Sequence, residues 1–267
     1  MNLRRSYAIT YRYFSLLKSS PDRFIGLYVW MLIDMVLWGF ISHYLDQILP
    51  AGFNAISAFL GAVLLANFFS RVMLNINMTF FEDMWARNFL NIFASPLRIS
   101  EYLLGLIVCA VLTSSAGLVL AFISAALLFG FSPLAYGAAL VPFIFILFLF
   151  GIALGILGCA IVLARGPSSE WFIWPIPAVI SPFVGVYYPI STLPEWMQAI
   201  AAILPPSYVF EGLRGVLAGH PADLTQLSLG ISLSVLYILL AGVCFHRVYR
   251  KAMRTGLIAR YSAENAN

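Results

Sequence analysis

Long runs of apolar residues, broken by short polar stretches, alternate along the whole chain. Six runs are long enough to cross a membrane, and they cover roughly residues 24–45, 55–80, 101–130, 137–164, 171–190 and 224–246. A helix of about 20 apolar residues spans the hydrocarbon core of a bilayer. The runs are continuous, whereas strands of a membrane barrel alternate over shorter segments. The pattern therefore predicts an all-α integral membrane protein with six transmembrane helices, in one domain over residues 1–267.

Composition agrees with this fold class. The chain has 267 residues, of which 62% are hydrophobic and only 10% charged, and its mean hydropathy is +0.93. Soluble domains carry about 25% charged residues. The first 20 residues are not expected to be a signal peptide, because no small-residue cleavage site follows a short apolar core.

Lys and Arg gather on one side of the predicted topology. They precede the first span, lie between the second and third and between the fourth and fifth, and follow the last: Arg4, Arg5, Arg12, Lys18, Arg23, Arg87, Arg98, Arg165, Arg247, Arg250, Lys251, Arg254 and Arg260. By the positive-inside rule both termini are cytoplasmic, and residues 247–267 form a cytoplasmic tail. The pI near 9.0 then reflects topology and contact with anionic lipid, and no nucleic-acid partner is expected.

Residues 1–21 are predicted to form an amphipathic helix at the membrane interface. Its apolar and aromatic positions recur at helical spacing: Leu3, Tyr7, Tyr11, Phe14 and Leu17. Arg5 and Arg12 fall on other faces, a pattern typical of helices that lie in the interface instead of crossing it. The segment is either a basic anchor or an element with a mechanical role.

The stretch FEDMWARNFLNIFASP, residues 81–96, interrupts the apolar pattern after the second run. Trp85, Phe89 and Phe93 recur at helical spacing, and Ser95-Pro96 follows them. This spacing predicts a short cytoplasmic helix over residues 81–94. The alternative is an ordinary polar loop, which would need no aromatic stripe.

Two charges lie inside predicted spans. Asp34 is about 15 Å from the cytoplasmic start of the first span, and Arg71 is at a matching depth in the second. An unpaired charge in hydrocarbon is costly, so the two are predicted to pair or to share a polar network. The pair either fixes the two spans together or faces a substrate or gate.

The fifth run and the segment after it are rich in proline. Pro175, Pro177, Pro182 and Pro189 kink or interrupt a helix in the run. Residues 191–219 are too apolar for an ordinary loop and too broken to span, so they are predicted to form two short re-entrant helices. Glu211 and Arg214, three apart, are predicted to pair on one helix face.

Other residues indicate packing and not chemistry. Gly151, Gly155 and Gly158 line one side of the fourth span and allow close helix contact. The three cysteines are scattered among the spans, so no metal site or disulfide is expected. The sequence contains no phosphate-binding G-x-x-x-x-G-K-[ST] loop and no H-E-x-x-H motif, and no serine has a matching base. No catalytic residue is therefore assigned, and the chain is predicted not to be an enzyme.

Two stretches resemble the ABC-2 family of bacterial export permeases. EDMWARNFLNIFASPLRISEYLLG, residues 82–105, is similar to the family's segment between the second and third spans. GVYYPISTLPEWMQAIAAILPPSYVFEGLR, residues 185–214, is similar to its second signature. Many family members carry Gly-Thr-Leu-Glu inside the first motif, where this chain has residues 87–91 with the sequence RNFLN, so contact details with a partner differ here.

The resemblance implies a transporter whose ATPase is a separate chain. The expected partners are two ATP-binding cassette subunits, which hold ATP and Mg, and a second permease copy, as a homodimer rather than a heterodimer. Residues 81–96 would be a coupling helix, with six contact residues: Glu82, Asp83, Met84, Trp85, Arg87 and Phe89. Seven residues of the second signature would form an extracytoplasmic gate: Tyr188, Pro189, Pro194, Glu195, Trp196, Glu211 and Arg214.

The implied function is export of an amphipathic, lipid or lipid-linked substrate across the bacterial inner membrane, with surrounding lipid as a further partner. No cofactor is expected in this chain itself. The alternative from another class is an ATP-independent membrane channel or an integral lipid-modifying enzyme.

Overall fold

The structure is a computed structural model that describes residues 3–19, 21–48, 56–86 and 88–256. Every regular element within those ranges is helical, as predicted. The α-helices are α1 Leu3–Ser19, α2 Pro21–Ile48, α3 Gly61–Trp85, α4 Phe89–Ala94, α5 Ile99–Phe129, α6 Leu140–Arg165, α7 Ile176–Ile180, α8 Glu195–Ile203, α9 Pro205–Leu217 and α10 Leu224–Thr255. Short π or 3-10 turns lie at Ile56–Leu60, Pro133–Ala139, Pro167–Phe172 and Ile190–Thr192.

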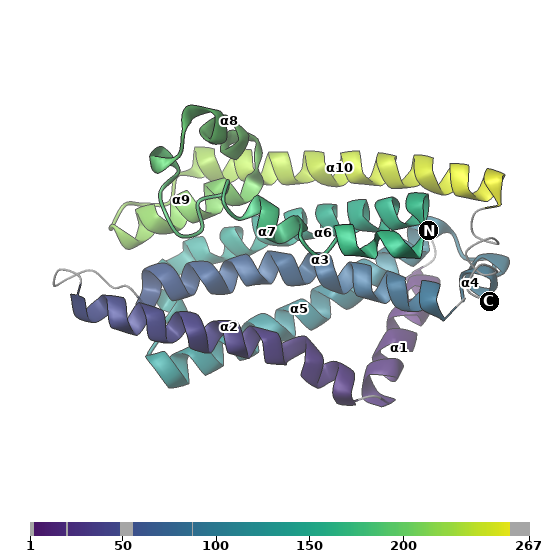
Figure 1. Cartoon of the computed structure of the whole chain (residues 1–267), viewed down its shortest axis with the longest axis horizontal. Coiled ribbons are helices and arrows are strands. Elements are labelled where there is room, and N and C mark those ends of the chain that lie inside the picture. The colour runs from purple at the N-terminus through teal and green to yellow at the C-terminus, as the bar shows by residue number, and fades with distance from the viewer. Residues whose placement is uncertain (1–2, 20, 49–55, 87, 257–267) are drawn as a thin grey trace.

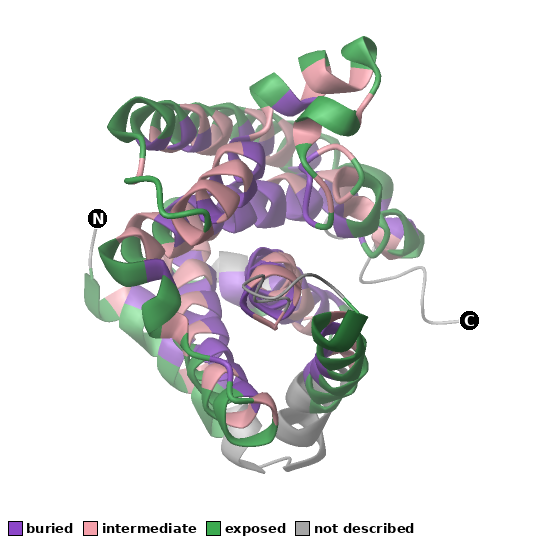
Figure 2. Ribbon diagram, turned by 90° about the vertical axis from the view of Figure 1, so that its left-hand side faces the viewer, coloured by how far each residue is buried: buried purple, intermediate pink, exposed green. Residues whose placement is uncertain are grey.

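The long helices α2, α3, α5, α6 and α10 run along the length of the molecule (Figure 1). At one end of this bundle lies α4, whereas α8 and α9 lie toward the other end, and α1 crosses steeply near the end that holds α4. Buried residues lie on the faces that the long helices turn toward one another, and exposed residues lie on the outer faces (Figure 2). Each helix satisfies its own backbone, which is what lipid requires of a spanning segment.

Glycines let α6 approach α3 closely. A Cβ added at Gly155 would lie 2.7 Å from Cδ1 of Ile76, and one added at Gly158 would lie 2.3 Å from Oδ1 of Asn77. At Gly151 the added Cβ would lie 2.8 Å from a backbone oxygen of α3. The predicted role of these glycines in helix contact is confirmed. In lipid, such close packing is a principal source of helix association.

A buried polar contact joins α3 to α5 on its other side. The side-chain amide of Asn75 donates hydrogen bonds to the hydroxyls of Thr113, at 3.1 Å, and of Ser114, at 2.9 Å. All three residues are buried. Interhelical hydrogen bonds of this kind fix the register of packed helices in a membrane.

Four helical stretches of the described chain are long and apolar enough to cross a membrane: Ile56–Trp85, Ile99–Phe129, Pro133–Arg165 and Leu224–Thr255. Alongside them runs α2, with 28 residues, which coincides with the first predicted span. The multi-pass membrane prediction is confirmed in this coarser form. The count of six crossings and the cytoplasmic position of both termini stay predictions.

The fifth predicted span, 171–190, is not one continuous helix, and the interruption agrees with the expectation from its prolines. The structure has a 3-10 turn over Pro167–Phe172, the five-residue α7, and irregular backbone up to Pro189. Proline supplies no backbone donor and clashes with the preceding turn, and Pro175, Pro177 and Pro182 fall within this segment. The interrupted segment still runs from the end of α6 toward α8 and α9 (Figure 1).

The single helix predicted over residues 81–94 is also wrong, because it is split between two elements. The α3 helix continues to Trp85, and a turn separates it from α4. The backbone N–H of Ala86 still bonds to the carbonyl of Glu82, at 2.9 Å, so the helix ends later than hydropathy suggests. Phe81 and Met84 keep packing inward through this last turn.

The remaining boundaries agree closely with prediction. The N-terminal helix is α1, and two short helices, α8 and α9, occupy the predicted re-entrant segment. The last helix, α10, runs to Thr255, past residue 246 where the sixth span was expected to end. Residues 257–267 of the predicted tail lie outside the described residues.

Candidate functional site

The predicted coupling residues fall into two environments. Glu82, Asp83, Met84 and Trp85 lie in the last turn of α3, and Phe89 begins α4. Arg87 lies outside the described residues. Trp85 is 49% exposed, whereas Asp83 is only 2% exposed. Met84 and Phe89 are also buried, and Glu82 is half-buried. The exposed surface here is therefore centred on Trp85, with the half-buried Glu82 three residues earlier in α3.

Phe89 holds α4 against the bundle. Its ring centroid lies 5.0 Å from that of Phe80 on α3 and 6.5 Å from that of Tyr102 on α5, the latter edge to face. Aromatic pairs in these geometries are stabilising beyond their buried area. Phe89 thus anchors α4 inside this chain, and it offers no surface to another chain in this arrangement.

Both oxygens of the Asp83 carboxylate are occupied. The guanidinium of Arg12, on α1, donates to Oδ1, and the hydroxyl of Tyr102, on α5, donates to Oδ2 at 2.8 Å. The Asp83 side chain is 3% exposed. A buried carboxylate is tolerated when its lone pairs are met by a counter-ion and by hydrogen bonds, as here. Asp83 therefore joins α3 to both α1 and α5.

A second buried carboxylate, Glu101, lies in the first turn of α5. Its Oε2 accepts the backbone N–H of Arg98 at 3.0 Å, which caps the helix, and lies 3.6 Å from Nη1 of Arg5 on α1. The same Arg5 nitrogen donates to the carbonyl of Pro96. Arg5 thus contacts the chain just after α4 and the start of α5 together.

These contacts form a group that we call the α1 clamp: Arg5, Arg12, Asp83 and Glu101. Arg5 and Arg12 are seven residues apart, so they lie on one face of α1 about 10.5 Å apart along its axis. One arginine holds the end of α3 and the other holds the start of α5. The helix α1 therefore bridges both flanks of the α4 segment. Sequence reasoning missed this group, although the seven-residue spacing of two arginines was a signal for it.

Apolar packing supports the clamp from the same side of α1. A Cβ at Gly105, on α5, would lie 2.8 Å from Cβ of Ile9, so only glycine permits this approach. The opposite face of α1 is exposed, and it carries the predicted stripe: Leu3, Tyr7, Tyr11 and Phe14. An outward aromatic stripe on a helix that crosses the bundle steeply is suited to the membrane interface.

At the far end of the bundle, Glu211 and Arg214 pair as predicted, at 2.9 Å. Glu211 also accepts the backbone N–H of Ile190 at 2.6 Å, and Arg214 donates to the carbonyl of Gly185 at 2.7 Å. The pair therefore ties α9 to both ends of the 185–190 loop. Gly185 has a φ of +68°, which favours glycine at this turn.

The other predicted gate residues surround this loop and α8. The Tyr188 hydroxyl donates to the carbonyl of Pro182 at 2.8 Å. Pro194 precedes α8 and Glu195 begins it. Trp196 is 61% exposed, and its ring lies 6.2 Å from that of Phe183. The structure brings the motif together as one folded unit, and its action as a gate stays a prediction.

Asp34 lies on α2 and Arg71 on α3, and their pairing or shared polar network stays a prediction. The 185–190 loop meets α2, the helix that carries Asp34, through the side chain of Tyr187. One turn further along α2, Trp38 stacks on the same Tyr187 with centroids 4.7 Å apart. The inner side of α2 therefore meets the loop that α9 holds.

Residues 7–218 match the family described as ABC-2 type transporter. This match covers most of the chain and includes the 185–214 motif and every residue of the α1 clamp except Arg5. The chain belongs to the ABC-2 transporter family. A weaker similarity relates it to Nodulation protein J of Rhizobium leguminosarum bv. viciae, 33% identical over 84 residues. That alignment covers 30% of this chain and 32% of the relative, so the chain matches about a third of the relative's length.

Membership defines the general role of this permease. It is the transmembrane part of an ABC transporter, a multi-pass membrane protein that is not itself catalytic. The family implies an ATP-binding cassette partner, which must contact the permease at a surface outside the lipid.

Proposed function

We propose that this permease is the pore-forming subunit of a bacterial ABC exporter, which works as two permease copies with two ATP-binding subunits. The observation that carries the proposal is the contrast at the end of α3. Trp85 is 49% exposed, whereas Asp83 and Phe89 close to it in the chain are buried. Arg12 and Tyr102 bond to Asp83, and Phe80 packs against Phe89. An exposed tryptophan on a rigid support is typical of an interface anchor.

In this proposal Trp85 fills a groove on the ATP-binding subunit, and Glu82 adds a polar contact at its edge. ATP and Mg are bound on that partner. When two ATP-binding subunits close on ATP, the displacement enters this permease at the end of α3. The α1 clamp then makes the ends of α3 and α5 move with α1 as one unit, because Asp83 and Glu101 are both held by it.

At the other end, the Glu211–Arg214 pair and the 185–190 loop would form the extracytoplasmic gate. The loop contacts α2 through the stack of Tyr187 on Trp38, and it is bonded to α9 through Arg214. A shift of α2 would therefore displace α9. An aromatic stack beside the Asp34 carboxylate suits a substrate with both apolar and polar parts. We therefore propose an amphipathic, lipid or lipid-linked substrate.

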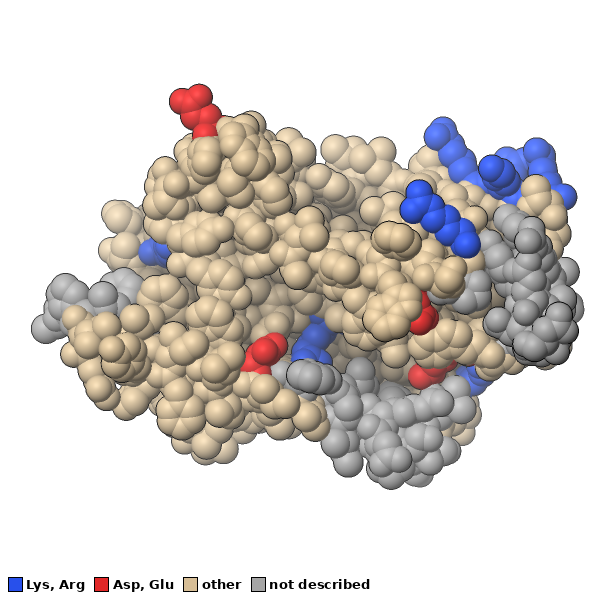
Figure 3. All heavy atoms as spheres, viewed as in Figure 1, with Lys and Arg blue, Asp and Glu red and all other residues tan. Residues whose placement is uncertain are grey.

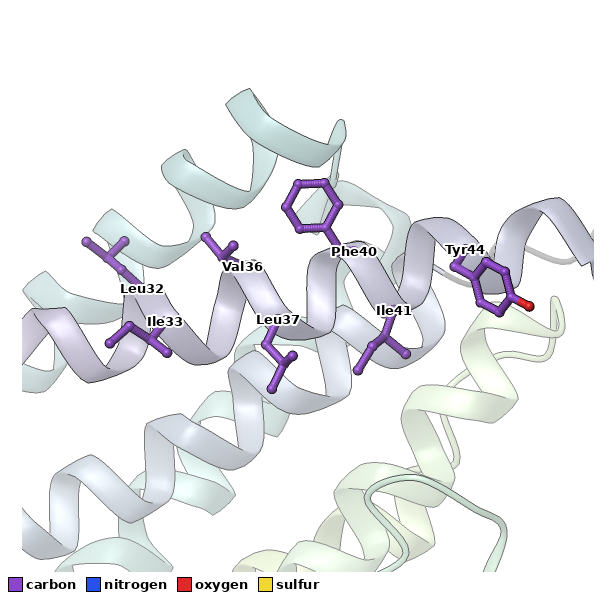
Figure 4. A pocket seen from close by; sticks show the side chains of 7 residues that line it. All are labelled: Leu32, Ile33, Val36, Leu37, Phe40, Ile41 and Tyr44. Carbon is purple, nitrogen blue, oxygen red and sulfur yellow. The ribbon is translucent and has the colours of Figure 1, made fainter.

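The outer face of α2 supports the proposed homodimer. This face is apolar and exposed, and Figure 4 shows its side chains, all from α2: Leu32, Ile33, Val36, Leu37, Phe40, Ile41 and Tyr44. A second copy packed along α2 would cover it and place two Asp34 regions near the shared path. Disulfide cross-linking of Leu37→Cys in membranes should trap a dimer, whereas a surface that faces lipid alone would yield only monomer.

The coupling proposal is tested by co-expression of the permease with an ATP-binding cassette subunit and by measurement of ATPase activity and substrate export. The double variant Glu82→Ala, Trp85→Ala should still fold, because neither side chain is in the core. We expect it to lose partner binding or export coupling. An intact complex of this variant with full coupled activity would show that the lever lies elsewhere.

A further inference from the structure

The cytoplasmic-facing part of α10, in the predicted topology, carries a row of cations along one helix face. Arg247, Arg250, Lys251 and Arg254 follow the spacing i, i+3, i+4, i+7, so they share a face. Figure 3 shows Lys and Arg gathered where α10 ends. The opposite face packs into the bundle through Phe245 and Ala252, both 1% exposed.

None of these four side chains forms an ion pair or side-chain hydrogen bond with any described residue. The contrast with α1 is direct, since Arg5 and Arg12 are held by Glu101 and Asp83. The positive charge on α10 is therefore not neutralised by any part of the chain that the structure describes.

A fifth cation lies nearby. Arg165, the last residue of α6, is exposed and also forms no ion pair with described residues. The pair Phe150–Tyr237, 5.5 Å apart, sets the register of α6 beside α10. Continued at equal rise along two parallel helices, that register places Arg165 level with Ala252.

The same face of α10 is apolar over its preceding turns. The exposed residues that lead into the cations continue the spacing of three and four: Leu229, Leu236, Leu240 and Val243. From Leu224 to residue 246 the helix rises about 34 Å, close to the thickness of about 30 Å of a hydrocarbon core. The cations then extend about 10.5 Å further, which matches the headgroup layer.

We propose that this face of α10, with Arg165, binds the headgroups of anionic phospholipids. The acyl chains lie along the apolar part of the face, and the phosphates meet Arg250, Lys251 and Arg254. A phospholipid has its apolar and anionic parts joined in this order, whereas an acidic protein surface would leave the adjacent apolar face uncovered. Clusters of this kind beside a span attract anionic lipid by charge.

The test uses the purified permease without an ATP-binding subunit, titrated with phosphatidylglycerol or phosphatidylcholine and observed by native mass spectrometry. We expect phosphatidylglycerol to bind more tightly. The triple variant Arg250→Gln, Lys251→Gln, Arg254→Gln should weaken its binding by about fivefold for each charge removed, on the order of a hundredfold in all. Phosphatidylcholine binding should stay unchanged.

A matched variant keeps the charge: Arg250→Lys, Lys251→Arg, Arg254→Lys should bind phosphatidylglycerol like the wild type. Soluble glycerol phosphate should not displace the lipid at equal concentration, because it lacks the acyl chains. All substituted positions are exposed and glutamine is a good helix former, so circular dichroism should match the wild type. Unchanged phosphatidylglycerol affinity in the glutamine variant would overturn the proposal. In a separate pull-down of the glutamine variant with the ATP-binding subunit, lost association together with intact lipid binding would also overturn it, since the face would then be a protein interface.

Discussion

Arg12→Gln removes the cationic half of the buried contact at Asp83 and keeps a side chain of similar length. Removal of one partner of a fully buried ion pair costs about 3–5 kcal/mol, whereas exposed pairs contribute about 0.2–1 kcal/mol. Here the Asp83 side chain is 3% exposed and that of Arg12 is 38% exposed. The contact therefore lies between the buried and the exposed case. We expect Arg12→Gln to lower the free energy of local opening of α1 and the α3–α4 junction by about 2 kcal/mol.

Hydrogen exchange measures that local free energy directly, because amides exchange through local opening. A loss of about 2 kcal/mol corresponds to roughly 30-fold faster exchange. The increase should be confined to peptides from α1 and from residues 82–101, where the N–H of Asn88 is bonded to the carbonyl of Asp83 at 2.9 Å. Peptides from α8 and α9 should exchange as in the wild type.

Arg250→Gln is the matched control, because Arg250 lies toward the same end of the bundle, is exposed, and forms no ion pair with described residues. It should leave exchange in residues 82–101 unchanged. The double variant Arg12→Gln, Asp83→Asn should recover part of the protection, because no buried charge is then left without a partner. If Arg12→Gln exchanges within twofold of the wild type in residues 82–101, the clamp does not hold this segment.

Three further predictions follow from packing and from the far-end motif. Gly158→Ala should lower the melting temperature and reduce the free energy of unfolding by about 1–3 kcal/mol, because the added Cβ overlaps Asn77. The control Gly242→Ala should be neutral or stabilising, because no atom lies within 4 Å of its added Cβ. Arg214→Gln should make the 185–190 loop more accessible to exchange while α10 stays protected, and an unchanged loop would contradict the tie to Gly185. Asn75→Leu should cost about 1 kcal/mol, measured by denaturation in detergent, since its two bonds to α5 are lost.

Local sequence signals predicted well those features that depend on neighbours in the chain. The Glu211–Arg214 pair was predictable because residues three apart meet on any helix. The glycine contact of α6 was predictable because small residues at helical spacing serve few other purposes in a span. The 185–214 motif could be recognised as a unit because it resembles a signature of the ABC-2 family.

Long-range pairing was not predictable in the same way. Hydropathy placed the end of the second span near residue 80, because Glu82 and Asp83 look like the start of a polar loop. The helix continues because Asp83 is neutralised by Arg12, from an element 71 residues away. In the fifth run, prolines predicted interruption, but the division into a 3-10 turn and a five-residue helix depends on tertiary contacts that periodicity does not show.

Photo-cross-linking at position 85 tests the central claim most directly, namely that the end of α3 receives the ATPase movement. A benzophenone side chain in place of Trp85 in an active complex should capture the ATP-binding subunit. One in place of Trp196, which is even more exposed and lies toward the other end of the bundle, should not. Capture at 85 alone, altered when ATP is added, is the predicted result. No capture at 85 in a complex that still couples ATP hydrolysis to export would contradict the account.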